Sequence, residues 1–206
     1  MWRFLVLPAA LNAIYSGLPV AILGVDRYRS TLLAQSERLS AALGPEAASE
    51  LVAGATEWTG ILASCLLSSL LLIGVCVLTA VLLRAFSVFF LKGEATFGAL
   101  LPGIANASSA YIAIGAVTAS VALIAGGTNT DLSSLGDCNL AQVLTPRGSL
   151  QWVAGSLIDV KALTFLVVLC ISLSERELAE GRRLSAFALV AWFIVRSTTS
   201  LVSLWT

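Results

Sequence analysis

The hydrophobic positions of this 206-residue chain form long runs that are separated by shorter polar segments. Each run holds about the 20 apolar residues that a helix needs to cross a bilayer. The pattern predicts an all-α integral membrane protein with one membrane domain, residues 1–206, built as a bundle of five transmembrane helices. The predicted spans are residues 4–25, 59–83, 100–125, 150–173 and 184–205.

The segment between the first two spans, residues 26–57, is the longest polar stretch. Leucines recur at helical spacing among charged residues over 32–43, which is typical of an amphipathic helix. Gly44 ends this helix, and Pro45 suits the first turn of a second one, which can continue into the next span. We interpret 26–57 as a helical extramembrane segment that caps the bundle. The alternative is an interfacial helix or a partner-docking site.

The third span is rich in small residues, and Gly115 and Ala119 form a small-xxx-small pair. Such pairs let helices approach closely in lipid, where there is no hydrophobic drive between them. We therefore place this span at the centre of the bundle, with Gly115 and Ala119 at a helix contact. Asn106 is expected to hydrogen-bond to a neighbouring helix.

The composition of the chain excludes several classes of protein. The chain is 58% hydrophobic and 12% charged, whereas a soluble domain is about one quarter charged, so its solvent is largely lipid. Its formal net charge is zero, which gives no indication of a nucleic-acid partner. Histidine is absent, which removes the commonest metal ligand and the usual near-neutral base. We predict no enzyme activity, no catalytic residues, no metal site and no cofactor.

Three charged residues interrupt the last two apolar runs: Asp159, Lys161 and Arg196. Charges at such depth cost a few kcal/mol each, so they usually face other helices and have partners. Folding the chain back near Leu178 brings Asp159 and Arg196 to the same level, roughly 20 Å from the turn. The sequence predicts an Asp159–Arg196 ion pair within an intramembrane polar network that also includes Asn106. Lys161 lies two residues from Asp159, so we expect it to face elsewhere and to reach the outer interface.

Positive residues in the loops predict the orientation, because cytoplasmic loops favour Lys and Arg. With five spans, the side of the N-terminus carries more of them than the opposite side. We therefore expect the N-terminus in the cytoplasm and the C-terminus outside. The first side holds Arg3, Arg84, Lys92, Arg176, Arg182 and Arg183, and the second holds Arg27, Arg29, Arg38 and Arg147.

Two stretches carry a resemblance to a known family. Residues 90–97 (Phe-Leu-Lys-Gly-Glu-Ala-Thr-Phe) resemble the connector of bacterial Yip-family proteins, and residues 156–174 are similar to that family's fourth span. Residues 132–136 resemble its preceding loop, although Lys161 stands where the family usually has an aromatic residue. These are five-span membrane proteins related to the eukaryotic Rab-interacting Yip proteins. The resemblance implies a multi-pass protein of the bacterial inner membrane.

Two functions remain open from the sequence. The first is a non-enzymatic membrane scaffold or accessory subunit, Yip-like, acting in membrane organisation or in assembly of a larger complex. Its expected partners are the lipid bilayer and another membrane protein or a second copy of the chain. The alternative is a transporter or channel component that uses the intramembrane charges of Asp159, Lys161 and Arg196.

Overall fold

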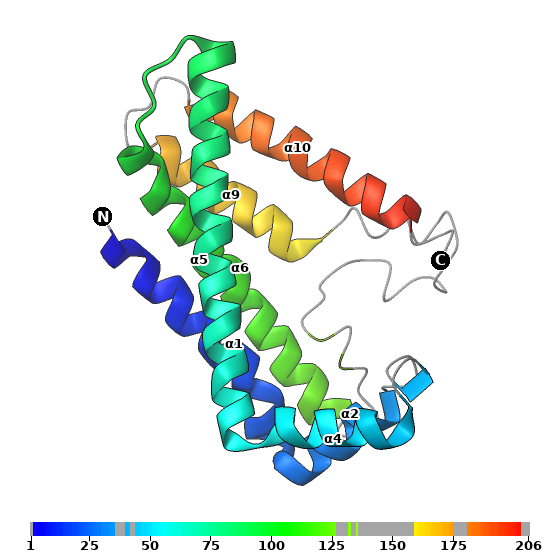
Figure 1. Cartoon of the computed structure of the whole chain (residues 1–206). Helices are drawn as coiled ribbons and strands as arrows, with labels where there is room; N and C mark the ends of the chain where they lie inside the picture. Colours follow the sequence, from blue (N-terminus) through cyan, green and yellow to red (C-terminus); the bar gives the residue numbers. More distant parts are fainter. Residues whose placement is uncertain are drawn as a thin grey trace.

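The computed structural model of the chain is a bundle of helices (Figure 1). It describes residues 2–35, 40, 41, 44–126, 132, 135, 159–174 and 181–202, with the backbone alone at 35, 174, 195–197 and 199–202. Within this part of the chain the residues form helices and turns and no strand. The predicted all-α class is therefore confirmed for the described residues.

In the described part of the chain, three helices are long and apolar enough to cross a membrane. The first joins a short turn, η1 (Trp2–Leu5), to α1 (Val6–Leu23). The second joins α5 (Trp58–Phe86) to the π-helical turn η2 (Ser87–Leu91). The third is α6 (Phe97–Gly126), which runs in the direction of α1 and opposite to α5 (Figure 1). The first three predicted spans are thus confirmed as helices of spanning length and composition.

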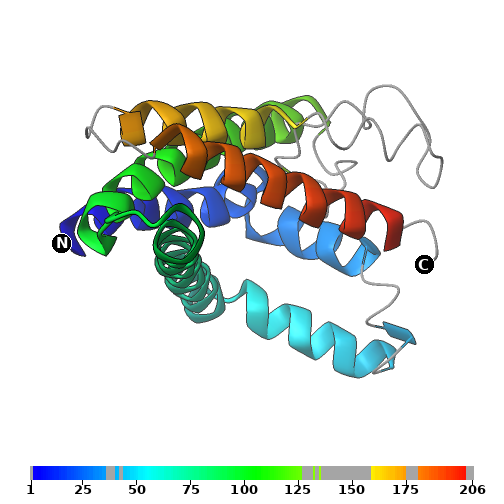
Figure 2. The ribbon, with the colours of Figure 1, turned by 90° about the horizontal axis from the view of Figure 1, so that it is seen from above.

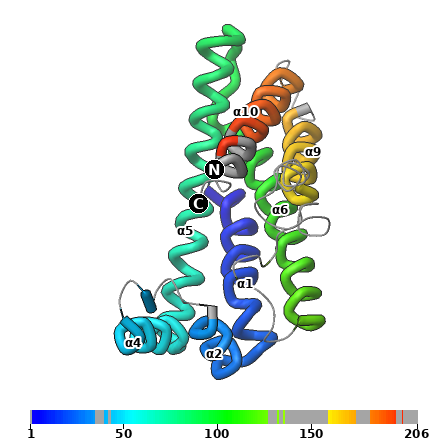
Figure 3. Tube along the Cα trace, turned by 90° about the vertical axis from the view of Figure 1, so that its right-hand side faces the viewer, coloured from blue at the N-terminus to red at the C-terminus, as the bar shows by residue number. Residues whose placement is uncertain are grey.

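The polar segment forms two helices, α2 (Val25–Gln35) and α4 (Pro45–Thr56), which lie across one end of the bundle (Figure 3). Pro45 occupies the first turn of α4, as the sequence predicts. The expectation that α4 continues unbroken into the next span is wrong. Glu57 has an extended backbone (φ −69°, ψ 156°), so the chain turns a corner there before α5 begins.

The last two helices, α9 (Val160–Ser174) and α10 (Gly181–Val202), lie beside one half of the bundle. Figure 2 shows α5 nearly end-on. In the same view α10 runs across the direction of the α5 axis. The 15 residues of α9 rise only about 22 Å, less than the roughly 30 Å hydrocarbon core of a bilayer. The span predicted at 150–173 is helical from Val160, and residues 150–158 lie outside the described part. The number of spans stays a prediction.

The central helix is α6, which contacts α1, α5 and α9. Its small residues set how closely α9 approaches. A Cβ added to Gly103 would lie 3.4 Å from the Cβ of Ser172, and one added to Gly115 would lie 3.5 Å from the Cδ of Lys161. These two contacts make α6 and α9 antiparallel neighbours, and they place the start of α9 near the middle of α6. The core around them includes Leu100, Leu101, Ile104, Leu169, Leu173 and Leu184.

Candidate functional site

Asp159 stands immediately before α9 and caps it. Its Oδ1 accepts the backbone N–H of Lys161 at 2.8 Å and that of Ala162 at 3.4 Å. The side chain is only 7% exposed, so these bonds are made inside the protein. The prediction that Asp159 lies within a continuous helix is wrong. A short carboxylate competes for free backbone N–H groups, which favours it at a helix start over a helix interior.

Lys161 lies inside the bundle and is 6% exposed. Its ammonium nitrogen is 5.0 Å from the centroid of the Tyr111 ring, a cation–π contact between α9 and α6. Its aliphatic chain fills the space beside Gly115, and the ring of Tyr15 from α1 approaches the same glycine. The expectation that Lys161 reaches the outer interface is therefore wrong. The missing side chain at Gly115 and the face of Tyr111 together give the cation a place within the bundle.

Arg196 belongs to α10, but its side chain lies outside the described residues. The Asp159–Arg196 ion pair therefore stays a prediction. Asn106 is exposed on α6, and the structure does not bring it to Asp159 or Lys161. It is nine residues from Gly115, which is about two and a half turns, so the two residues face opposite sides of α6. Asn106 therefore lies apart from Asp159 and Lys161, and its predicted place in a polar network with Arg196 stays a prediction.

Gly115 and Ala119 are both buried, on the side of α6 that faces the bundle. This is where the small-xxx-small pattern predicts a helix contact. The sequence analysis did not predict the contact of Tyr111 with Lys161 or the approach of α9 to α6 at Gly103. The signal for Tyr111 is its spacing: it lies four residues before Gly115, and residues four apart share a helix face.

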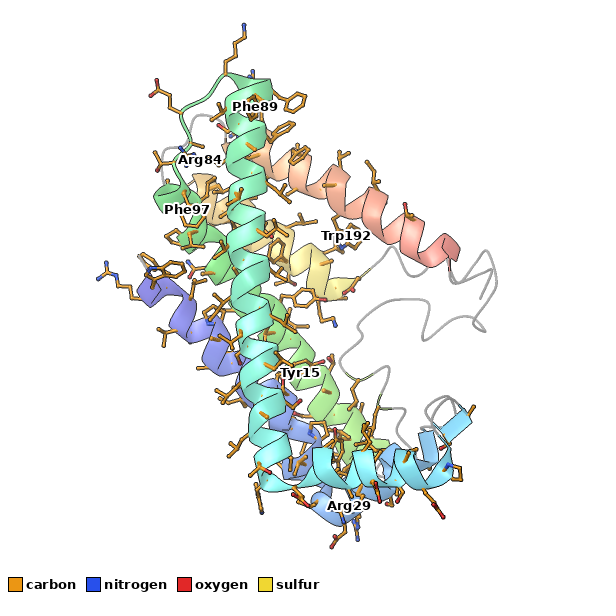
Figure 4. The ribbon with its side chains drawn as sticks, viewed as in Figure 1. Tyr15, Arg29, Arg84, Phe89, Phe97 and Trp192 are labelled. Carbon is orange, nitrogen blue, oxygen red and sulfur yellow. The ribbon has the colours of Figure 1, made fainter. Side chains whose placement is uncertain are left out.

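A cavity of about 340 Å³ adjoins this site. Ser108, Tyr111 and Trp192 (labelled in Figure 4) are the polar residues of its lining, and the other lining residues are apolar. Ser108 also lies 3.3 Å from the sulfur of Cys76 in a hydrogen bond between α6 and α5. The site is thus a buried cation and a helix cap beside a mainly apolar cavity. The cavity is lined by Leu72, Val75, Ser108, Tyr111, Ala162, Phe165 and Trp192.

No family model, curated protein or solved structure matches this chain. The resemblance of residues 90–97 and 156–174 to the Yip family therefore stays a prediction from the sequence. Among the described residues, no three of the His, Cys, Asp and Glu type gather closely enough to hold a metal ion. A function for this chain has to be inferred from its own geometry and charge.

The charges of the described residues differ between the two ends of the bundle. Figure 4 shows Arg84 and Phe89 at the end of α5 that is remote from Arg29. At the opposite end, the Nε of Arg29 in α2 donates to the hydroxyl of Thr56 in α4 at 2.7 Å, which joins these two helices. The first end has five cations and one carboxylate, whereas the second has two cations and four carboxylates. These groups are Arg3, Arg84, Lys92, Arg182, Arg183 and Glu94 at the first end, and Arg27, Arg29, Asp26, Glu46, Glu50 and Glu57 at the second.

Proposed function

We propose that this protein is a non-enzymatic membrane scaffold or accessory subunit, Yip-like, with five spans in the bacterial inner membrane. Three helices of spanning length support its place in a membrane. The excess of described cations at the end where α6 begins supports a cytoplasmic N-terminus, since positive residues favour the cytoplasmic side. In this orientation α2 and α4 cap the outer end of the bundle, and the C-terminus lies outside.

The observation that carries the proposal is the outward position of Asn106. This residue is exposed on α6, a helix of spanning length, and Ala113 and Val117 are exposed on the same side. An amide that faces lipid lacks hydrogen-bond partners, and asparagine often bonds across a contact between membrane helices. The small side chain of Ala113 lets a second helix approach closely. This face of α6 is therefore suited to a helix of another membrane protein.

Site-specific photo-crosslinking in native membranes tests this function. A photoreactive amino acid at Ala113 is expected to give a protein adduct of defined mass, and Asn106→Leu is expected to abolish it. The same amino acid at Leu70, which is 64% exposed on α5, is the matched control and should give no such adduct. An adduct of twice the chain mass would identify a second copy as the partner. The scaffold proposal fails if Ala113 gives no protein adduct, or if Asn106→Leu leaves the adduct unchanged.

A transporter or channel component is the second candidate, and the burial of Asp159 and Lys161 near mid-bundle favours it. Buried intramembrane charges often line ion or proton paths. Asparagine keeps the oxygen that caps a helix but cannot be ionised, so Asp159→Asn separates charge from structure. In proteoliposomes, a proton or ion flux that is lost in Asp159→Asn at unchanged thermal stability would support transport. Absence of flux in the unsubstituted protein would contradict it.

A further inference from the structure

A groove of about 350 Å³ separates α9 from α10 on the outside of the bundle. Val167 on α9 is 56% exposed and Leu189 on α10 is 38% exposed, so its walls are open to the surroundings of the protein. Among the described residues of its lining, Arg182 carries the one charged side chain. The lining comprises Leu163, Leu166, Val167, Cys170, Arg182, Ser185, Ala186 and Leu189.

The groove lies at the depth of the membrane. On its inner side α9 is held against α6 by the approach of Gly103 to Ser172 and of Gly115 to Lys161, and α6 is a helix of spanning length. From Leu163 to Cys170 the groove follows α9 for about 10 Å. It therefore extends from near the middle of the bundle toward the end where α10 begins.

The polar end of the groove is basic. Arg182 lies in the first turn of α10, beside Gly181, whose added Cβ would lie 3.2 Å from the backbone of Leu173. The second turn of α10 contacts α5, because Phe187 stacks on Phe86 with ring centroids 3.7 Å apart. The cations Arg84 and Lys92 belong to the same end of the bundle. A guanidinium at the headgroup level above an apolar channel matches an anionic phosphate that carries an acyl chain.

We propose that this groove binds an anionic phospholipid of the surrounding membrane. One acyl chain lies along the wall from Cys170 to Leu163, and the phosphate of the headgroup accepts hydrogen bonds from Arg182. The chain covers apolar side chains of both helices, and the bound lipid joins α10 to α9 on the side that faces away from α6. The site depends on the membrane location of the bundle, and it is independent of the scaffold role.

The test uses the full chain in nanodiscs made of equal amounts of phosphatidylglycerol and phosphatidylcholine. A phosphatidylglycerol with a photoreactive group in its acyl chain is added in trace amount, and a parallel sample receives a phosphatidylcholine with the same group. Crosslinked peptides are identified by mass spectrometry, and the adduct yields of the two lipids are compared. Adducts are expected on 163–170 and 185–189. Arg182→Gln removes the charge-assisted hydrogen bonds that the guanidinium donates to the phosphate, and it is expected to lower the yield of phosphatidylglycerol adducts about fivefold, which corresponds to about 1 kcal/mol.

Two further variants test whether the lipid binds in the groove through Arg182 or only at a basic surface. Arg183→Gln removes the same charge from the same turn of α10, but Arg183 does not line the groove, so its adduct yield is expected to stay within twofold of that of the unsubstituted protein. Ala186→Phe fills the groove and is expected to suppress adducts of both lipids. Equal losses in Arg182→Gln and Arg183→Gln would overturn the proposal in favour of a diffuse basic surface. Unchanged adducts in Ala186→Phe, or no preference for phosphatidylglycerol over phosphatidylcholine, would also overturn it.

Discussion

The ammonium group of Lys161 lies over the face of the Tyr111 ring, 5.0 Å from its centroid. The two residues come from different helices, α9 and α6, and Gly115 leaves the space through which the lysine chain reaches the ring. Burying a cation is costly unless groups around it compensate its charge, and the face of an aromatic ring is one such group. This contact therefore couples the position of α9 to the central helix.

The Lys161–Tyr111 contact predicts coupled effects of substitution. Tyr111→Leu removes the ring and should destabilise the protein by about 1–2 kcal/mol, between the values for an exposed and a desolvated cation–π contact. Tyr111→Phe keeps the ring face and should cost much less. The Lys161→Met variant has no cation at this place. Tyr111→Leu should therefore lower the free energy of unfolding less in that variant than in the unsubstituted protein. Thermal unfolding in one detergent measures this double-mutant cycle, and strictly additive effects would contradict the contact.

Asp159 provides a second prediction because its carboxylate caps α9. Asp159→Ala leaves the N–H groups of Lys161 and Ala162 without their side-chain acceptor, and it should cost about 1–2 kcal/mol of stability. Asp159→Asn retains a capping oxygen and should cost less than half of that. Chemical unfolding of the purified variants measures the difference. If Asn is as damaging as Ala, the charge of Asp159 matters more than its cap.

The sequence predicted the spans better than it predicted the charged site. Long apolar runs fixed α1, α5 and α6 to within a few residues, except that α5 and η2 extend to Leu91. The start of α9 was missed because the apolar run from residue 150 hides the capping role of Asp159. Lys161 was misplaced because its pocket is built by Gly115 and Tyr111, and sequence spacing alone does not show which helix faces them. Such contacts depend on how helices meet in space.

The corner between α4 and α5 predicts opposite effects for two glycines of α5. A Cβ at Gly60 would clash with the carbonyl oxygen of Gly54 and would lie 2.9 Å from that of Ala55. Gly60→Ala should therefore displace α4 and cost about 1–3 kcal/mol, as overpacking does. Gly74 has nothing within 4 Å of an added Cβ, so Gly74→Ala should be neutral or stabilising, by up to about 1 kcal/mol. Equal melting temperatures for the two variants would contradict the close approach of α4 to Gly60 at this corner.

Tyr28 predicts a loss of stability in alkali. It lies in α2, outside the spans, and burial, with a smaller effect of the nearby Cys65, raises its pKa above the ordinary value of 10.0. The folded state therefore binds this proton more tightly than the unfolded state. The resulting stability is fully present below pH 10, and it is lost as the pH rises through the folded pKa. Tyr28→Phe should weaken the dependence of the free energy of unfolding on pH above pH 10. A pH dependence equal to that of the unsubstituted protein would refute the prediction.

The stack of Phe86 on Phe187 predicts how α10 is held. The two rings lie 3.7 Å apart at 10°, and Phe90 extends the stack from η2 with its centroid 5.2 Å from that of Phe86. Because the helices have no hydrophobic drive between them in lipid, this aromatic packing has to supply much of the α5–α10 attraction. Phe187→Ala should lower stability by about 2 kcal/mol and speed hydrogen exchange in α10. Phe193→Ala, which alters a 44% exposed ring on the same helix, is the control and should have a smaller effect. Equal exchange rates in the two variants would show that the stack does not hold α10 in place.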